Sequence, residues 1–146
     1  MKKIFTAIIT IVMLAGVAIA DDNIVEIPID KVPNLGLRMV SSYFPGIKPV
    51  KAVKNKTKDM KNRTCILLEN NATIDFDKDG NWMIVDCRDS EVPTRMVPGK
   101  SQMFLNKSYA GKKVVFMGRE IKNGDITILL DDNTELHFTD KHELIK

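Results

Sequence analysis

The sequence is poor in the residues from which most catalytic and metal centres are built. Its 146 residues include two cysteines, two histidines and one tryptophan. It contains no Gly-rich phosphate loop, no H-E-x-x-H pair and no G-x-S-x-G elbow, so the common signatures of nucleotide binding, zinc proteolysis and serine hydrolysis are missing. His137 and His142 lie five positions apart and would face opposite sides of a continuing strand, which suits no shared metal. We therefore expect a protein that is not an enzyme and that holds no cofactor.

The two cysteines, Cys65 and Cys87, leave one question open. Export into an oxidising compartment would favour a disulfide between them. Alternation along the strands on which they fall points their side chains to opposite faces of the sheet, and a disulfide requires converging Cβ atoms. The sequence does not decide between these readings.

Long apolar runs are absent except for one at the N-terminus. Two lysines precede the apolar run 4–17, which is shorter than the roughly 20 residues of a membrane span. An Ala-Ile-Ala sequence that ends at Ala20 matches a small-residue cleavage site. The sequence predicts a signal peptide over residues 1–20, cleaved after Ala20. The remaining chain is expected to be periplasmic or secreted, without membrane insertion.

An excess of one charge is also absent. The formal net charge is +3, and the two lysines of the expected signal peptide account for two of these charges, which leaves +1. A nearly neutral chain argues against a general nucleic-acid binder. We therefore expect no nucleic-acid partner. The open sheet face described below is expected to meet another exported protein instead.

What the sequence does contain is a pattern that occurs twice. Pro33 opens a helical stretch that ends at Gly46, and Pro98 and Gly111 repeat this arrangement 65 positions later. A strand-like run ending at Phe76 has a counterpart ending at Phe138, with an offset of 62 positions. Both copies carry short turns between strand-like runs, which is typical of antiparallel hairpins. The sequence therefore predicts an α+β fold of two tandem units, each one helix followed by a four-stranded antiparallel sheet, with the helices packed on one sheet face.

We place a lead segment at residues 21–31 and the two units at 32–90 and 91–146. The expected strands are Ile47–Val53, Thr64–Glu69, Thr73–Asp77, Trp82–Cys87, Lys113–Arg119, Asp125–Asp131, Thr134–Thr139 and Glu143–Lys146.

Two motifs of the first copy resemble a known family. A helix ending in Tyr-Phe-Pro-Gly at Tyr43–Gly46 and a hairpin ending in Phe-Asp-Lys-Asp-Gly-Asn-Trp at Phe76–Trp82 are similar to those of bacterial PepSY-like domains, which are grouped with beta-lactamase-inhibitor-like proteins. The resemblance covers both copies, from about Ile29 onward, and is weaker in the second. It implies an exported, non-enzymatic module whose helices back an antiparallel sheet and whose free sheet face meets a protein partner.

Alternation along the strands places Trp82, Ile84 and Leu67 on the sheet face away from the helices. Exposed aromatic and aliphatic residues in one patch suit protein binding, unless the second unit or an N-terminal strand at Asn23–Ile29 covers them. The loop after the first strand contains Lys56 and Lys58 in a basic run. This run either steers an acidic partner or is a solvated hairpin tip.

Asp75, Asp77 and Asp79 open a D-x-D-x-D-G sequence that matches the start of a calcium loop. Such a loop normally lies between helices, whereas here strands flank it. The alternative is a hairpin turn at Asp79-Gly80 with aspartates on its flanks.

The sequence therefore favours a periplasmic, non-enzymatic protein-binding module, with inhibition of a peptidase or other hydrolase as one form of that function. The alternative is a periplasmic protein that binds calcium or another small ligand through its aspartate turn.

Overall fold

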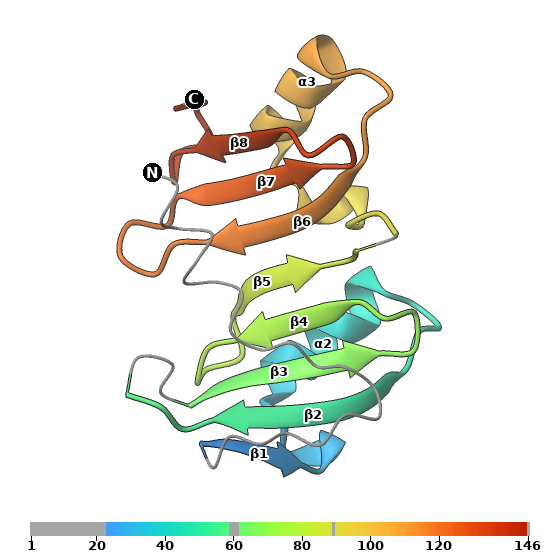
Figure 1. The fold of residues 1–146 in the computed structure, drawn as a ribbon, viewed down its shortest axis with the longest axis vertical. Helices are drawn as coiled ribbons and strands as arrows, with labels where there is room; N and C mark the ends of the chain where they lie inside the picture. The colour runs from blue at the N-terminus through green and yellow to red at the C-terminus, as the bar shows by residue number, and fades with distance from the viewer. Residues whose placement is uncertain (1–22, 59–61, 89, 146) are drawn as a thin grey trace. The chain divides into compact units, whose positions relative to one another are not determined.

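The computed structural model describes residues 23–58, 62–88 and 90–145, so the expected signal peptide at 1–20 lies outside the described residues. Within these residues short strands dominate, together with two α-helices of ten residues each (Figure 1). In chain order the elements are β1 (Ile24–Ile27), the 3-10 turn η1 (Ile29–Lys31), α2 (Asn34–Tyr43), β2 (Pro49–Asn55), β3 (Arg63–Leu68), β4 (Thr73–Phe76), β5 (Trp82–Asp86), the 3-10 turn η2 (Thr94–Met96), α3 (Gly99–Ser108), β6 (Val114–Arg119), β7 (Ile126–Leu130) and β8 (Glu135–Phe138).

The strands belong to one eight-stranded antiparallel sheet in the order β1 to β8. The expected fold class, two tandem units that each combine a helix with their own four-stranded sheet, is therefore wrong. β5, expected as the last strand of the first unit, pairs with β6, where Val85 lies opposite Met117. Local sequence pattern does not reveal whether the second edge of a strand is occupied, because the backbone groups of that edge are the same in every sequence.

Most of the predicted strands are present close to their expected positions. The exception in the described part of the chain is the run from Glu143, which forms only a single bridge between Phe138 and Leu144 instead of a strand. The lead segment forms the strand β1, within the stretch Asn23–Ile29 considered above as a strand, and it pairs with β2.

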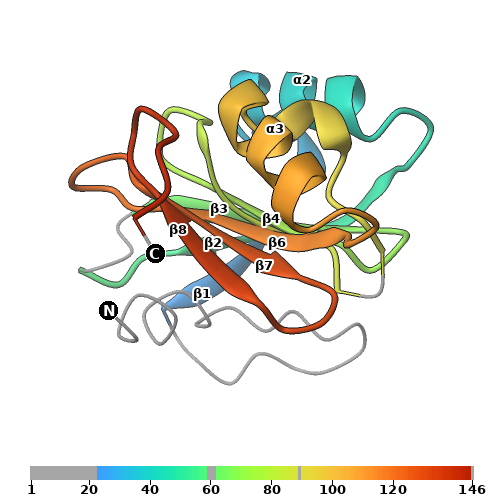
Figure 2. The same ribbon diagram turned by 90° about the horizontal axis from the view of Figure 1, so that it is seen from above.

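By its internal contacts the chain divides into two compact units, one up to Trp82 and one from Met83. In the first unit, α2 lies on one face of β2–β4 (Figure 2). The helix begins directly after Pro33, whose fixed φ and missing N–H suit a helix start. The helix comes close to the sheet at Gly36, where an added Cβ would lie 3.1 Å from the ring of Phe76. The strands supply the core beneath it with side chains that are 0% exposed: Ile66, Leu68, Ile74 and Phe76.

In the second unit, α3 lies on one face of β6–β8 (Figure 2). Phe104 on the helix meets Phe138 on β8 edge-on, with 5.9 Å between the ring centroids. Leu105, Ile128 and Leu130 complete this buried layer. No helix among the described residues is long and apolar enough to cross a membrane.

Corresponding turns in the two units are closed by the same hydrogen bonds. The Gly80 N–H donates to the Asp77 carbonyl over 3.1 Å, and the His142 N–H donates to the Thr139 carbonyl over 2.8 Å. Both donor residues have positive φ, +91° at Gly80 and +64° at His142. The second turn therefore adopts the same geometry without an Asp-Gly pair.

Gly80 provides a test of how this turn docks on α2. Substitution by alanine would force a Cβ to 2.9 Å from the Gly36 nitrogen at a φ of +91°. We expect Gly80→Ala to lower the free energy of unfolding by about 1–3 kcal/mol, measured by urea denaturation. Gly99→Ala is the matched control, because nothing lies within 4 Å of an added Cβ at that position. Equal stability of the two variants would contradict the proposed docking of the turn.

Candidate functional site

In the first unit, the sheet face opposite α2 is built from a short apolar row. Val53, Cys65 and Leu67 form a buried cluster against which Ile24 packs. Strand register places Val53 opposite Cys65, so these side chains lie on the same face. Leu67 is on the predicted face but is only 4% exposed. It therefore offers almost no surface to a partner in this conformation.

An ion pair lies on the same face. Asp75 is opposite Cys65 on the neighbouring strand, and its Oδ2 lies 3.4 Å from an Nη of Arg63. Both side chains are buried, with exposures of 10% for Arg63 and 7% for Asp75. A buried carboxylate needs a cationic partner, since the loss of its hydration is otherwise uncompensated. Asp75 is thus committed to Arg63, a partner that the spacing of the aspartates did not reveal.

Asp77 closes the turn that follows β4. Its Oδ1 accepts hydrogen bonds from the backbone N–H groups of Asp79 and Asn81, each at 2.9 Å, and its Oδ2 accepts one from the Asn81 side chain at 3.1 Å. Partial burial raises the pKa of Asp77, but the hydrogen bonds from Asn81, Asp79 and Gly80 outweigh this effect and leave the pKa below its ordinary value of 3.8. The carboxylate is therefore already saturated by donors from its own turn.

The three aspartates do not converge on a cation site. Asp75 faces Arg63, Asp77 faces its own turn, and no group of three or more His, Cys, Asp or Glu side chains among the described residues is arranged to hold a metal ion. The residues present in this turn do not fit a bound calcium ion.

In the second unit, the face opposite α3 carries aromatic and aliphatic side chains. Phe116 on β6 lies opposite Leu129 on β7, and Ile84 on β5 lies opposite Gly118. Ile84 is 6% and Phe116 is 7% exposed. Trp82 shares the face of Ile84 because the two are neighbours at i and i+2 on β5, and both Trp82 and Leu129 are half-buried. The role of Trp82, Ile84 and Leu67 in binding stays a prediction.

Phe116 was not singled out by the sequence. The register of β6 shifts between Val114 and Phe116, so Val115 is an extra residue. This bulge turns Phe116 to the face opposite α3, whereas uninterrupted alternation from Val114 would have turned it towards the helix. A bulge leaves no clear local signal in a run such as Val114–Met117.

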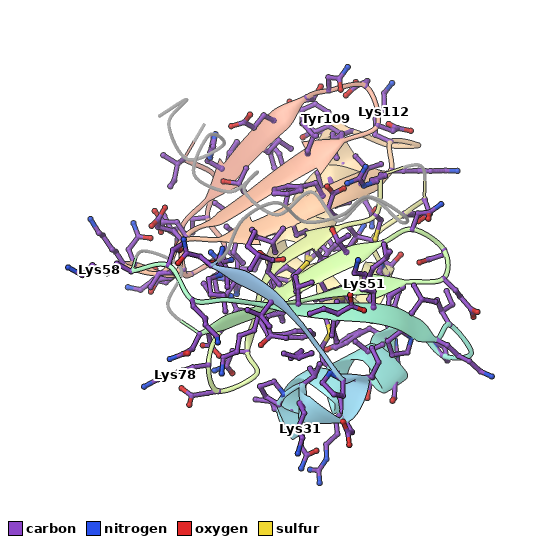
Figure 3. All side chains as sticks on the ribbon, turned by 60° about the horizontal axis from the view of Figure 1, so that its bottom comes forward. Lys31, Lys51, Lys58, Lys78, Tyr109 and Lys112 are labelled. Carbon is purple, nitrogen blue, oxygen red and sulfur yellow. The ribbon has the colours of Figure 1, made fainter. Side chains whose placement is uncertain are left out.

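Lys56 and Lys58 lie just after β2 and are exposed. In Figure 3 Lys58 projects away from the strands, and Lys51 lies on β2 itself. Lys51 is 3.7 Å from Glu26 on β1. The part of the basic run at residues 59–61 lies outside the described residues.

The cysteines and His137 are the other side chains with chemistry of their own. Cys65 and Cys87 are both buried and are not joined by a disulfide. Burial raises the pKa of the Cys87 thiol to about 12, and the charge of Asp86 adds to this, so the thiolate needed for nucleophilic attack is strongly disfavoured. His137 lies between Glu135, with Nε2 to Oε1 at 2.8 Å, and Thr127, with Nδ1 to Oγ1 at 3.1 Å.

Comparison with known proteins places these features in a family. No curated protein matches the chain. A crystal structure from Bacteroides thetaiotaomicron, described as a putative calcium-regulated periplasmic protein, is 28% identical, with a TM-score of 0.79 over 86% of this chain and 96% of the other. A second structure, from Bacteroides vulgatus and described as a putative periplasmic protein of unknown function, is 21% identical, with a TM-score of 0.78 over 84% of this chain and 97% of the other. It supports the fold alone.

The family model described as "Putative beta-lactamase-inhibitor-like, PepSY-like" matches residues 61–146. This match covers more than half of the chain and includes the strands from β3 to β8. The chain therefore belongs to the PepSY-like family.

Proposed function

We propose that this protein is an exported, periplasmic, non-enzymatic module that binds another protein. Three observations support this proposal. The chain belongs to the PepSY-like family, the similar solved structures are described as periplasmic proteins, and residues 1–20 have the composition of a signal peptide. Inhibition of an exported peptidase or other hydrolase is the form of binding that the family description suggests.

The observation that carries the proposal is the composition of the sheet face opposite α3. In a two-layer unit, the face without a helix is usually solvated and polar. Here β5, β6 and β7 place Ile84, Phe116 and Leu129 on that face. Leu129 and Trp82 are half-buried and supply its accessible apolar surface, whereas Ile84 and Phe116 are 6% and 7% exposed and offer little surface themselves. Apolar and aromatic side chains concentrated on such a face suit the centre of a protein interface.

The exposed lysines of the β2–β3 connection, in the first unit, support the proposal separately. Lys56 and Lys58 are solvent-exposed and have no acidic neighbour in the stretch 49–58. Such charges change the rate of association more than the final affinity. A partner that meets these lysines is therefore expected to be acidic where it contacts them.

Trp82 gives a direct readout, because it is the only tryptophan. We expect its fluorescence emission to shift when an exported peptidase or hydrolase that binds the protein is titrated in. Trp82→Ala should weaken that binding by about 2 kcal/mol, roughly 30-fold, if Trp82 anchors the contact. Met103→Ala is the control, because Met103 lies on α3 and is 73% exposed. Unchanged emission together with unchanged affinity of the Trp82 variant would remove Trp82 from the binding surface.

A calcium-binding function is the second candidate, favoured by the calcium-regulated description of the structure that is 28% identical. The geometry of the aspartate turn opposes it, because Asp75 is paired with Arg63 and Asp77 is saturated by Asn81 and Asp79. If calcium binds this chain, it needs ligands other than the present arrangement of this turn.

Calorimetry decides between these outcomes. We expect no heat of binding at millimolar calcium, because the carboxylates of the turn are already engaged. We also expect no change in melting temperature, which would rise with calcium concentration if calcium bound the folded protein. Asp77→Asn is the control variant, since it keeps an oxygen that can accept the turn hydrogen bonds and removes the charge. A rise in melting temperature of the original protein that is absent in Asp77→Asn would contradict the structural assignment of Asp77.

A further inference from the structure

The strand β1 has one edge that is not paired within the described part of the chain. It is first in the sheet order and pairs only with β2. The Lys56 N–H donates to the Asn23 carbonyl over 2.8 Å, which fixes the alternation of the ladder. Val25 and Ile27 therefore direct their backbone groups towards β2, whereas Ile24 and Glu26 direct theirs away from it.

The outer edge of the last strand, β8, is partly paired. The chain turns back after it, so that Leu144 bridges Phe138 and the Ile145 N–H donates to the His137 carbonyl over 2.7 Å. Part of the outer edge of β8 is thus covered by the chain itself. Among the described residues, nothing equivalent covers Ile24 and Glu26.

The open edge of β1 can accept an added strand. Ile24 and Glu26 together present two N–H donors and two carbonyl acceptors in the plane of the sheet, and peptides add to sheet edges through such groups. The residues around these groups are accessible: Val25 is 37% exposed and the side chain of Glu26 is 66% exposed.

Charge decides which kind of strand fits. The adjoining stretch 49–58 contains four lysines and no acid, and only Lys51 has a carboxylate partner there, Glu26 at 3.7 Å. Lys54 lies opposite Val25 on β2, and Lys56 follows at i+2 on the same face. An added strand would lie about 10 Å from β2, two strand spacings away, which an extended lysine side chain can bridge to a carboxylate. A second copy of this chain would instead bring a like-charged lysine set to the same edge.

We propose that the edge of β1 binds an extended, acidic segment of a partner protein by strand addition. This inference rests on the proposed protein-binding function and names a second contact, separate from the face that carries Trp82. The partner strand pairs with Ile24 and Glu26, and its acidic side chains lie on the face shared with Val25, towards Lys54 and Lys56.

The experiment uses the protein with a capped seven-residue peptide that alternates valine and glutamate. NMR hydrogen exchange reads the backbone amides of Ile24 and Glu26 directly. Peptide binding is expected to slow the exchange of these two amides at least tenfold and to leave those of Val25 and Ile27, already bonded to β2, little changed. Binding without protection of Ile24 and Glu26, or no binding at all, would overturn the proposal.

Two variants sharpen the assignment. Glu26→Pro removes an outward donor without removing a β1–β2 hydrogen bond, so peptide binding should be lost, while Glu26→Gln, which keeps the donor, should still bind. The double variant Lys54→Glu, Lys56→Glu should bind the peptide at least tenfold more weakly at low salt.

Two further results distinguish strand addition by a partner from dimerisation through β1 and from binding at the face that carries Trp82. A concentration-dependent dimer that Glu26→Pro dissolves would assign the edge to a second copy of the chain and overturn the acidic-segment proposal. Trp82→Ala should leave peptide binding unchanged. If the peptide protects the amides of Ile24 and Glu26 but the emission of Trp82 does not respond to a partner, strand addition at β1 is supported and protein binding at the face that carries Trp82 is contradicted.

Discussion

The structure depends on one constraint: the helix-facing side of the strands must bury its side chains in a fixed register. Phe76 on β4 and Phe138 on β8 are among the largest fully buried residues, one beneath each helix. Complete burial of such a side chain contributes roughly 1.5–3 kcal/mol. A slip of one residue would turn the whole row to the opposite face, so the turns and bulges must hold the register. The side chains that remain for recognition are therefore those of the opposite face, the edges and the loops.

Two β-bulges change which side chains lie on the face opposite the helices. The extra residues Val50 in β2 and Val115 in β6 interrupt the alternation, and side chains beyond each bulge change face relative to a regular strand. In β6 this keeps Met117 towards α3, where it is 0% exposed, and turns Phe116 away. The helix-side core and the aromatic residue of the opposite face thus arise from the same irregularity.

These relations explain what the sequence could predict. Strand positions and turns were predictable because periodicity and turn residues act locally, as in the turns at Asp77 and Thr139. The pairing of β5 with β6 was not, because it depends on backbone groups that every residue carries. The burial of Leu67 and Ile84 was also inaccessible, since alternation gives the face of a side chain but not what packs beside it. The Arg63–Asp75 pair joins residues twelve positions apart and leaves no periodic signal.

The aspartates show that a calcium-loop sequence forms a calcium site only when the backbone adopts the loop conformation. In a calcium loop, alternate residues curl around one ion so that their oxygens lie within 2.3–2.6 Å of it. Asp75 lies on an extended strand, where residues i and i+2 are about 7 Å apart along the chain, and Asp77 begins the turn. The same spacing of residues therefore separates the carboxylates instead of converging them. The Asp75 carboxylate pairs with Arg63, and the Asp77 carboxylate caps its own turn. The remaining charge of this region comes from the lysines of β2 and of the loop that follows it. An acidic partner therefore suits this region better than a cation does.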